Sequence, residues 1–122
     1  GRRFWLKRVE RLAGRLSGLL PPAPAAALLH GDLWTGNILV RDGAMAALID
    51  PACYRGDAEV DLAMLCLFGA PDDAFWEAYG PPESGWRERR CVYQLFPALV
   101  HLRLFGASYA PLVERLLAQA GA

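Results

Sequence analysis

His30-Gly31-Asp32-Leu33-Trp34-Thr35-Gly36-Asn37 is the most informative stretch of the sequence, and Ile49-Asp50-Pro51 follows it. Asp32 comes after a short apolar run and opens a tight polar loop, and Asn37 lies five residues later. Asp50 lies 18 residues after Asp32, at the end of the next predicted hairpin. Carboxylate and amide oxygens are ligands that Mg²⁺ prefers. The spacing therefore predicts that Asp32 faces a substrate hydroxyl while Asn37 and Asp50 converge on a metal ion.

The same residue types are common in turns, so a purely structural interpretation stands beside the chemical one. Asp, Asn and Gly are favoured in turns, and a D-x-x-x-x-N spacing alone carries little information. The His-Gly-Asp context, the hairpin and the Asp-Pro pair together favour a site. They match the division of roles in kinase-type phosphoryl transfer, where one Asp faces the acceptor hydroxyl while an Asn and a second Asp hold the metal.

A short hairpin joins the loop to Asp50. Apolar runs at residues 38–40 and 46–49 flank Arg41-Asp42-Gly43-Ala44, and an Asp-Gly pair in this setting predicts a tight hairpin turn. Most of the remaining sequence has helical character. The predicted fold class is therefore α+β and mostly helical, with a small β-hairpin next to the catalytic loop.

The chain is predicted to form a single domain over residues 1–122. Residues 4–20 carry an apolar stripe at helical spacing and are predicted to form one helix. Residues 21–26 form a Pro-rich linker, because proline lacks a backbone donor and restricts the residue before it. Residues 27–56 hold the catalytic loop and the metal-binding hairpin, and residues 57–122 form a helical subdomain.

Helices are predicted within this subdomain at residues 57–68, 72–79, 86–105 and 111–119. Asp57 is a suitable N-cap for the first of them. Pro97 lies inside the third and is expected to kink or split it. His101 lies on an apolar helix, where a histidine is more often structural than catalytic.

Composition excludes several classes of protein. The chain has 122 residues, 54% of them hydrophobic and 21% charged, and its 13 basic residues balance its 13 acidic ones. Disordered, collagen-like and strongly basic nucleic-acid-binding proteins are excluded, and no apolar run reaches the roughly 18 residues of a membrane span. Neither a nucleic acid nor a membrane is therefore expected as a partner. Cys53, Cys66 and Cys91 lack C-x-x-C spacing, which predicts neither a disulfide framework nor a zinc site and favours the cytoplasm.

Four segments together resemble one known family. They are His30-Gly-Asp-Leu-Trp-Thr-Gly-Asn37, Ile49-Asp-Pro-Ala52, Tyr54-Arg-Gly56 and Glu59-Val-Asp-Leu-Ala-Met64. They resemble the C-terminal lobe of the fructosamine kinase (ketosamine kinase) family, a branch of the aminoglycoside-phosphotransferase-like kinases, and the resemblance runs over residues 5–117. It implies the C-terminal lobe of a protein-kinase-like fold.

The resemblance also implies a role for each matching residue. Asp32 corresponds to the catalytic carboxylate that orients the sugar hydroxyl and accepts its proton. Asn37 and Asp50 correspond to the metal-binding residues, so ATP and Mg²⁺ are the expected cosubstrate and cofactor. His30 and Asp61 correspond to residues that support the catalytic loop. Trp34, two residues after Asp32, could stack on a sugar or belong to the core.

The implied reaction is transfer of the γ-phosphate of ATP to the 3-hydroxyl of a ketosamine, either free or on a glycated protein. The sequence contains no Gly-rich nucleotide loop, its only lysine is Lys7, and it begins with Gly1 rather than Met. We therefore expect a piece of a longer kinase that lacks the N-terminal ATP-binding lobe, is inactive alone and self-associates through apolar surface.

Three alternatives remain open at this point. The acceptor could be an aminoglycoside, choline or another small alcohol, because the loop motif does not separate these substrates. The chain could be a helical or partner-binding module without catalytic activity. A metal-dependent hydrolase could use Asp32 and Asp50, but that function leaves Asn37 unexplained.

Overall fold

The computed structural model describes the backbone of residues 2–122 and the side chains of residues 5–122. The chain divides into two compact units, where a single domain was predicted. The first unit contains the residues up to Ala23 together with Arg87–Ala122, and the second contains Pro24–Trp86. Residues 21–25 form neither helix nor strand and lead from the first unit into the second, whereas Ala26, the last residue of the predicted linker, begins a strand.

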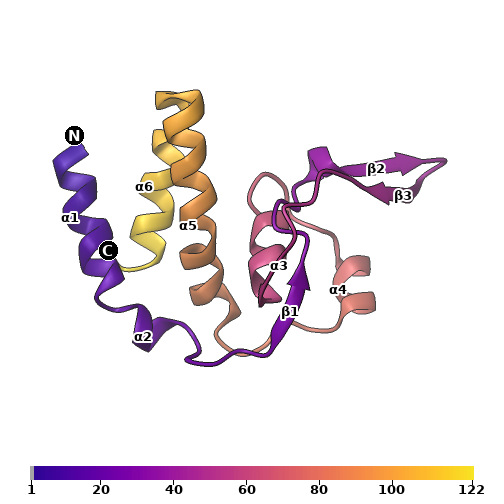
Figure 1. The fold of residues 1–122 in the computed structure, drawn as a ribbon, viewed down its shortest axis with the longest axis horizontal. Coiled ribbons are helices and arrows are strands. Elements are labelled where there is room, and N and C mark those ends of the chain that lie inside the picture. Colours follow the sequence, from indigo (N-terminus) through magenta and orange to yellow (C-terminus); the bar gives the residue numbers. More distant parts are fainter. Residues whose placement is uncertain (1) are drawn as a thin grey trace. The chain divides into compact units, whose positions relative to one another are not determined.

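The regular secondary structure described in the first unit is all helical. It contains α1 (Arg2–Ala13), the short α2 (Leu16–Leu19), most of α5 (Trp86–Phe105) and α6 (Ala110–Gln119), with a 3₁₀ turn before α6. Figure 1 shows α6 beside α5 and α1. The most deeply buried side chains of this unit include those of Leu12, Cys91, Ala98, Val113, Leu116 and Leu117.

One of the helix predictions in this unit needs correction, and another is confirmed. The helix predicted over residues 4–20 is interrupted after Ala13, because Gly14 is a weak helix former and the Arg15 amide bonds only three residues back, to the Leu12 carbonyl. The helix predicted over residues 86–105 is present with those bounds, as α5, and continues through Pro97. Its neighbours Leu95 and Ala98 are buried, and this packing offsets the missing Pro97 donor.

Glu114 connects α6 to α1 within this unit. Its carboxylate accepts hydrogen bonds from the Trp5 indole and from the Arg8 guanidinium on α1. Arg8 is itself buried and also donates to the carbonyl oxygen of Ala122. These hydrogen bonds, first that from Trp5 and then that from Arg8, lower the pKa of Glu114.

Replacing Glu114 with Gln should lower the Tm at neutral pH. The lowered pKa means that the folded state binds the Glu114 proton more weakly than the unfolded chain does. The stabilisation is therefore complete above the ordinary glutamate pKa of 4.5 and disappears as the pH falls through the lowered value. Thermal unfolding followed by circular dichroism should show a Tm difference that shrinks on acidification. The exposed Glu77→Gln is the control, and a difference that does not depend on pH would contradict the prediction.

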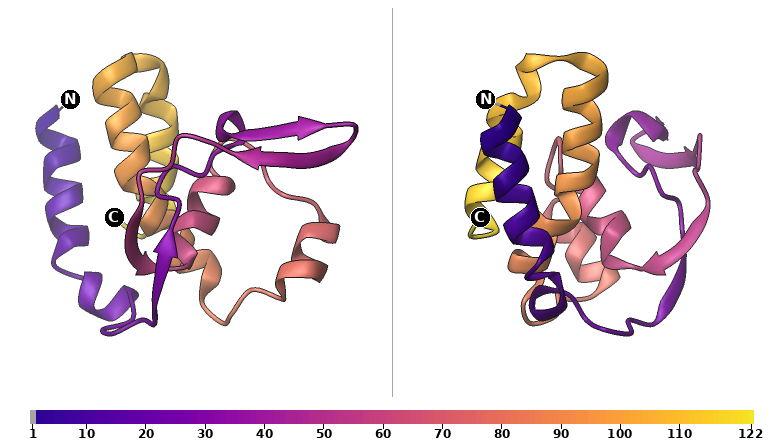
Figure 2. Two further views of the ribbon diagram at one scale, coloured as in Figure 1. Left: turned by 45° about the vertical axis from the view of Figure 1, so that its right-hand side comes forward. Right: turned by 60° about the vertical axis from the view of Figure 1, so that its left-hand side comes forward.

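The second unit contains two small antiparallel sheets and two helices. β1 (Ala26–Leu29) pairs with β4 (Tyr54–Asp57), and β2 (Ile38–Arg41) pairs with β3 (Ala44–Leu48). The helices are α3 (Glu59–Leu65) and α4 (Asp73–Tyr79). In the left view of Figure 2, β2 and β3 project as a narrow ribbon.

Local sequence explains most of these elements. Asp42 and Gly43 both have positive φ, 53° and 77°, as a two-residue type I′ turn requires, so the predicted hairpin is present. Asp72 caps α4 by accepting from the Phe75 amide at 3.0 Å. Asp57 accepts from the Glu59 amide at 3.0 Å, immediately before α3.

β4 was not predicted from the sequence. Its residues, Tyr-Arg-Gly-Asp, have little strand character of their own, and Gly weakens a strand. The strand forms because it pairs with β1, in a register that places Leu29 opposite Tyr54 and Ala26 opposite Asp57. None of the described helices is long and apolar enough to cross a membrane. The three cysteines are all free thiols.

Candidate active site

The predicted catalytic loop, residues 30–37, begins where β1 ends, and Asp61 accepts hydrogen bonds from the amides of its first two residues. One carboxylate oxygen of Asp61 accepts from the His30 amide at 2.7 Å, and the other accepts from the Gly31 amide at 2.9 Å. Asp61 lies in the first turn of α3, where a negative charge also interacts favourably with the helix dipole. The loop backbone is thereby fixed to α3 at the residue before Asp32.

His30 connects three segments of the site. Its carbonyl oxygen accepts from the amides of Ala52 and Cys53, at 2.7 and 3.1 Å. Its ring Nδ1 accepts from the Asp32 amide at 3.2 Å, so the neutral ring carries its proton on Nε2. That Nε2 lies 2.8 Å from the Ile49 carbonyl oxygen and donates to it. His30 therefore joins the loop of Asp32 to the residue before Asp50.

Asn37 lies against Asp32 and is buried. Its Nδ2 donates to the Asp32 carbonyl at 2.8 Å and to Asp32 Oδ2 at 3.2 Å. Its backbone bonds to the Trp34 carbonyl and to the Ile49 amide, both at 2.9 Å. Among the described residues, no hydrogen bond reaches Asn37 Oδ1. Every buried side-chain oxygen in that part of the chain has a hydrogen-bond partner, so Asn37 Oδ1 is not one of the buried oxygens. Asn37 Oδ1 is therefore accessible to solvent.

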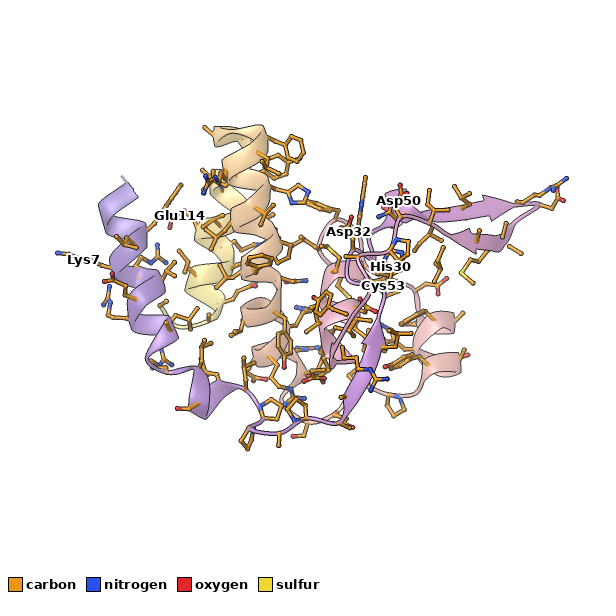
Figure 3. The ribbon with its side chains drawn as sticks, viewed as in Figure 1. Lys7, His30, Asp32, Asp50, Cys53 and Glu114 are labelled. Atoms are coloured by element: carbon orange, nitrogen blue, oxygen red, sulfur yellow. The ribbon has the colours of Figure 1, made fainter. Side chains whose placement is uncertain are left out.

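Asp50 is exposed and follows β3 in a left-handed conformation, with φ of 51°. A non-glycine residue in this region costs roughly 1 kcal/mol, so neighbouring contacts must impose it. Ile49 supplies such contacts, because its amide donates to Asn37 and its carbonyl accepts from His30. Figure 3 shows His30, Asp32 and Asp50 together where the hairpin meets the end of β1.

The oxygen atoms at this place suit Mg²⁺. Within the described part of the chain no three His, Cys, Asp or Glu side chains form a metal cage. Asn37 Oδ1 and the exposed Asp50 carboxylate are hard oxygen donors, and Mg²⁺ commonly takes only a few protein ligands, with phosphate and water oxygens completing its octahedron. The donor types of Asn37 and Asp50 would therefore suit a magnesium ion.

Trp34 forms an exposed aromatic surface beside the loop. Its indole ring lies over Gly36 so closely that a Cβ on Gly36 would overlap it. The ring also contacts Phe68 edge to face, with centroids 6.3 Å apart. Trp34 is 39% exposed and Phe68 is 41% exposed. Both rings of this pair are therefore partly exposed.

Tyr54 is a neighbour of the loop to which the sequence assigned no role. Its ring contacts Gly31, and the pKa of its hydroxyl is raised by burial and by the charge of Asp61. The only sequence signals were its place in Tyr54-Arg-Gly56 and the glycine at position 31. His101 lies in the other unit, where its Nδ1 is 2.7 Å from the Pro97 carbonyl oxygen.

A family model described as fructosamine kinase matches residues 6–121. The chain belongs to the fructosamine kinase family. A provisionally named ketoamine kinase from Lactiplantibacillus plantarum is 47% identical over 96 residues, which cover 76% of this chain and 34% of that protein. Another provisionally named ketoamine kinase, from Enterococcus faecium, is 41% identical over 116 residues, or 93% of this chain and 41% of that protein.

Solved structures of provisionally named fructosamine-3-kinases share the fold. One from Thermobifida fusca matches with a TM-score of 0.79 and 40% identity, over 95% of this chain and 41% of that chain. One from Haemophilus somnus matches with a TM-score of 0.76 and 31% identity, over 93% and 40%. This fructosamine kinase chain thus spans 34–41% of the length of these four relatives. The resemblance drawn from the motifs is confirmed, and so is a mostly helical fold with small sheets.

Proposed function

We propose that this chain is the catalytic-loop part, in the C-terminal lobe of a protein-kinase-like fold, of an enzyme that phosphorylates a sugar hydroxyl of ketosamines with Mg²⁺ and ATP. The observation that carries the proposal is the pairing of Asn37 with Asp32. Asn37 donates to Asp32 Oδ2, and among the described residues no hydrogen bond reaches Asp32 Oδ1. One oxygen of Asp32 is thereby oriented by the protein, and the other is left for an acceptor hydroxyl.

Each residue then has a distinct task. Asp32 Oδ1 orients the sugar hydroxyl and accepts its proton as the oxygen forms a bond to the γ-phosphorus and the bond to ADP breaks. Asn37 Oδ1 and the Asp50 carboxylate would hold Mg²⁺, which when bound neutralises charge on the phosphates. His30 and Asp61 keep Asp32 and Asp50 in place. Trp34 contributes an exposed aromatic plane on which a sugar can stack.

The matched relatives are longer, so activity belongs to the complete protein that carries these residues. We propose that the 122 residues alone do not turn over, since their only lysine, Lys7, lies on α1 and no Gly-rich phosphate loop is present. The exposed Phe96 and Leu104 of α5 favour self-association of the isolated chain.

The proposal is tested by measuring ADP release from the complete protein with Mg·ATP and a panel of acceptors. Fructoselysine should be phosphorylated, and an aminoglycoside and choline should not. Chelation of Mg²⁺ with EDTA should stop the reaction, and added Mg²⁺ should restore it. Turnover only with the aminoglycoside or choline would favour the small-alcohol alternative. No turnover with any acceptor would favour a chain without catalytic activity.

A further inference from the structure

Tyr54 contacts the catalytic loop at its tightest point. A Cβ built on Gly31 would lie 2.7 Å from Tyr54 Cε1, 2.9 Å from Ala52 Cβ and 3.0 Å from Tyr54 Cδ1. Real Cβ atoms do not approach other atoms this closely, so the edge of the Tyr54 ring packs directly on the backbone of Gly31. Gly31 also has φ of 86°, which favours glycine. The residue before Asp32 is thus shaped by the ring beside it.

The Tyr54 ring lies on one face of the β1–β4 sheet. Tyr54 is opposite Leu29 in the register, and Gly56 lies two residues further on the same face. A Cβ on Gly56 would be 3.1 Å from Leu29 Cδ1 and 3.9 Å from Tyr54 Cε2. Leu29 is only 2% exposed. Because positions 31 and 56 are glycines, no Cβ occupies the space beside the Tyr54 ring at either position, and at position 31 a Cβ would overlap the ring.

Asp61 acts on the same short piece of backbone. Its carboxylate accepts from the amides of His30 and Gly31. The pKa of Tyr54 is raised by burial and, to a smaller extent, by the negative charge of Asp61. Gly31 is therefore held by a hydrogen bond from its amide and by van der Waals contact with a ring.

We propose that Tyr54 is a positioning residue for the phosphoryl transfer, an inference that rests on the proposed function. Its ring fixes the backbone of Gly31 and so sets where the Asp32 carboxylate meets the acceptor hydroxyl. Tyr54 is 47% exposed, and no described side chain hydrogen-bonds to its hydroxyl. The planar ring is the required part, and the hydroxyl is dispensable.

The test compares Tyr54→Ala with Tyr54→Phe in two measurements. In the complete protein, Tyr54→Ala should lower kcat for fructoselysine roughly 10- to 100-fold with little change in the KM for ATP, as expected for a misplaced catalytic group. Tyr54→Phe keeps the ring and should have a kcat close to that of the wild type. In the same complete protein, amide hydrogen exchange followed by NMR should be faster at His30 and Gly31 in Tyr54→Ala but not in Tyr54→Phe.

Two further variants make the outcome decisive. Leu28→Ala removes a 77% exposed side chain from the opposite face of the same sheet and should change neither measurement. Tyr54→Leu removes the ring but keeps an apolar side chain, so it takes the place of Tyr54→Ala if that variant does not fold. It should show the same loss of kcat and the same faster exchange. Unchanged kcat and exchange in folded variants without the ring, or equal losses in Tyr54→Phe, would overturn the proposal. A wild-type protein without kinase activity would refute the proposed function, whereas the exchange rates would still decide whether Tyr54 holds Gly31.

Discussion

Replacing Asp32 with Asn is expected to reduce kcat for fructoselysine phosphorylation by roughly 10²- to 10⁴-fold, the usual contribution of a positioned general base. An amide has nearly the same shape as the carboxylate but cannot accept the hydroxyl proton. The backbone of residue 32 would keep its bonds to His30 Nδ1 and Asn37 Nδ2, because both use main-chain atoms. The loss should therefore appear in kcat, measured as ADP release from the complete protein, with Tm nearly unchanged.

Asp42→Asn is a matched control for this substitution. Asp42 lies in the turn of the β2–β3 hairpin, is exposed and has φ of 53°. Asn-Gly suits a type I′ turn as well as Asp-Gly does, so this variant should fold and turn over like the wild type. If the Asp32→Asn enzyme keeps more than about a tenth of wild-type kcat, Asp32 is not the proton acceptor.

The predictable parts of the molecule are those in which local sequence decides the structure. The hairpin depends on Asp42 and Gly43, whose left-handed conformations match one turn type. Asp72 caps α4 because a short carboxylate reaches the amide three residues on. The spacing of Asp32 and Asn37 likewise brings the two side chains together within one short loop. Their catalytic and metal-binding roles, and that of Asp50, remain predictions.

The parts that could not be predicted depend on partners distant in sequence. β4 has weak strand character and exists because β1 pairs with it. The proposed role of Tyr54 depends on the contact of its ring with Gly31, and no periodicity in the sequence indicates that contact. The division into two units likewise follows from packing, which composition and helical pattern do not specify.

Replacing Asp61 with Asn should affect both stability and turnover. The two carboxylate oxygens of Asp61 accept from adjacent amides, of His30 and Gly31. Asn offers one acceptor and one donor, so one of these amides would face an NH₂ group. Losing a hydrogen bond to a charged acceptor costs about 2 kcal/mol, which urea unfolding can measure. Because the freed backbone leads directly to Asp32, kcat should also fall, by roughly 100-fold.

Asp73→Asn separates this effect from the loss of a charge at a helix N-terminus. Asp61 and Asp73 both lie in the first turn of a helix, but Asp73 is exposed. Its neutralisation should cost only the helix-dipole contribution, about 0.5 kcal/mol, and leave kcat unchanged. Asp61→Asn also removes one of the two causes that raise the pKa of Tyr54, so Tyr54 should titrate at lower pH in NMR of the variant. Equal stability losses in the two variants, together with normal turnover, would mean that Asp61 acts only through the helix dipole and not through the loop.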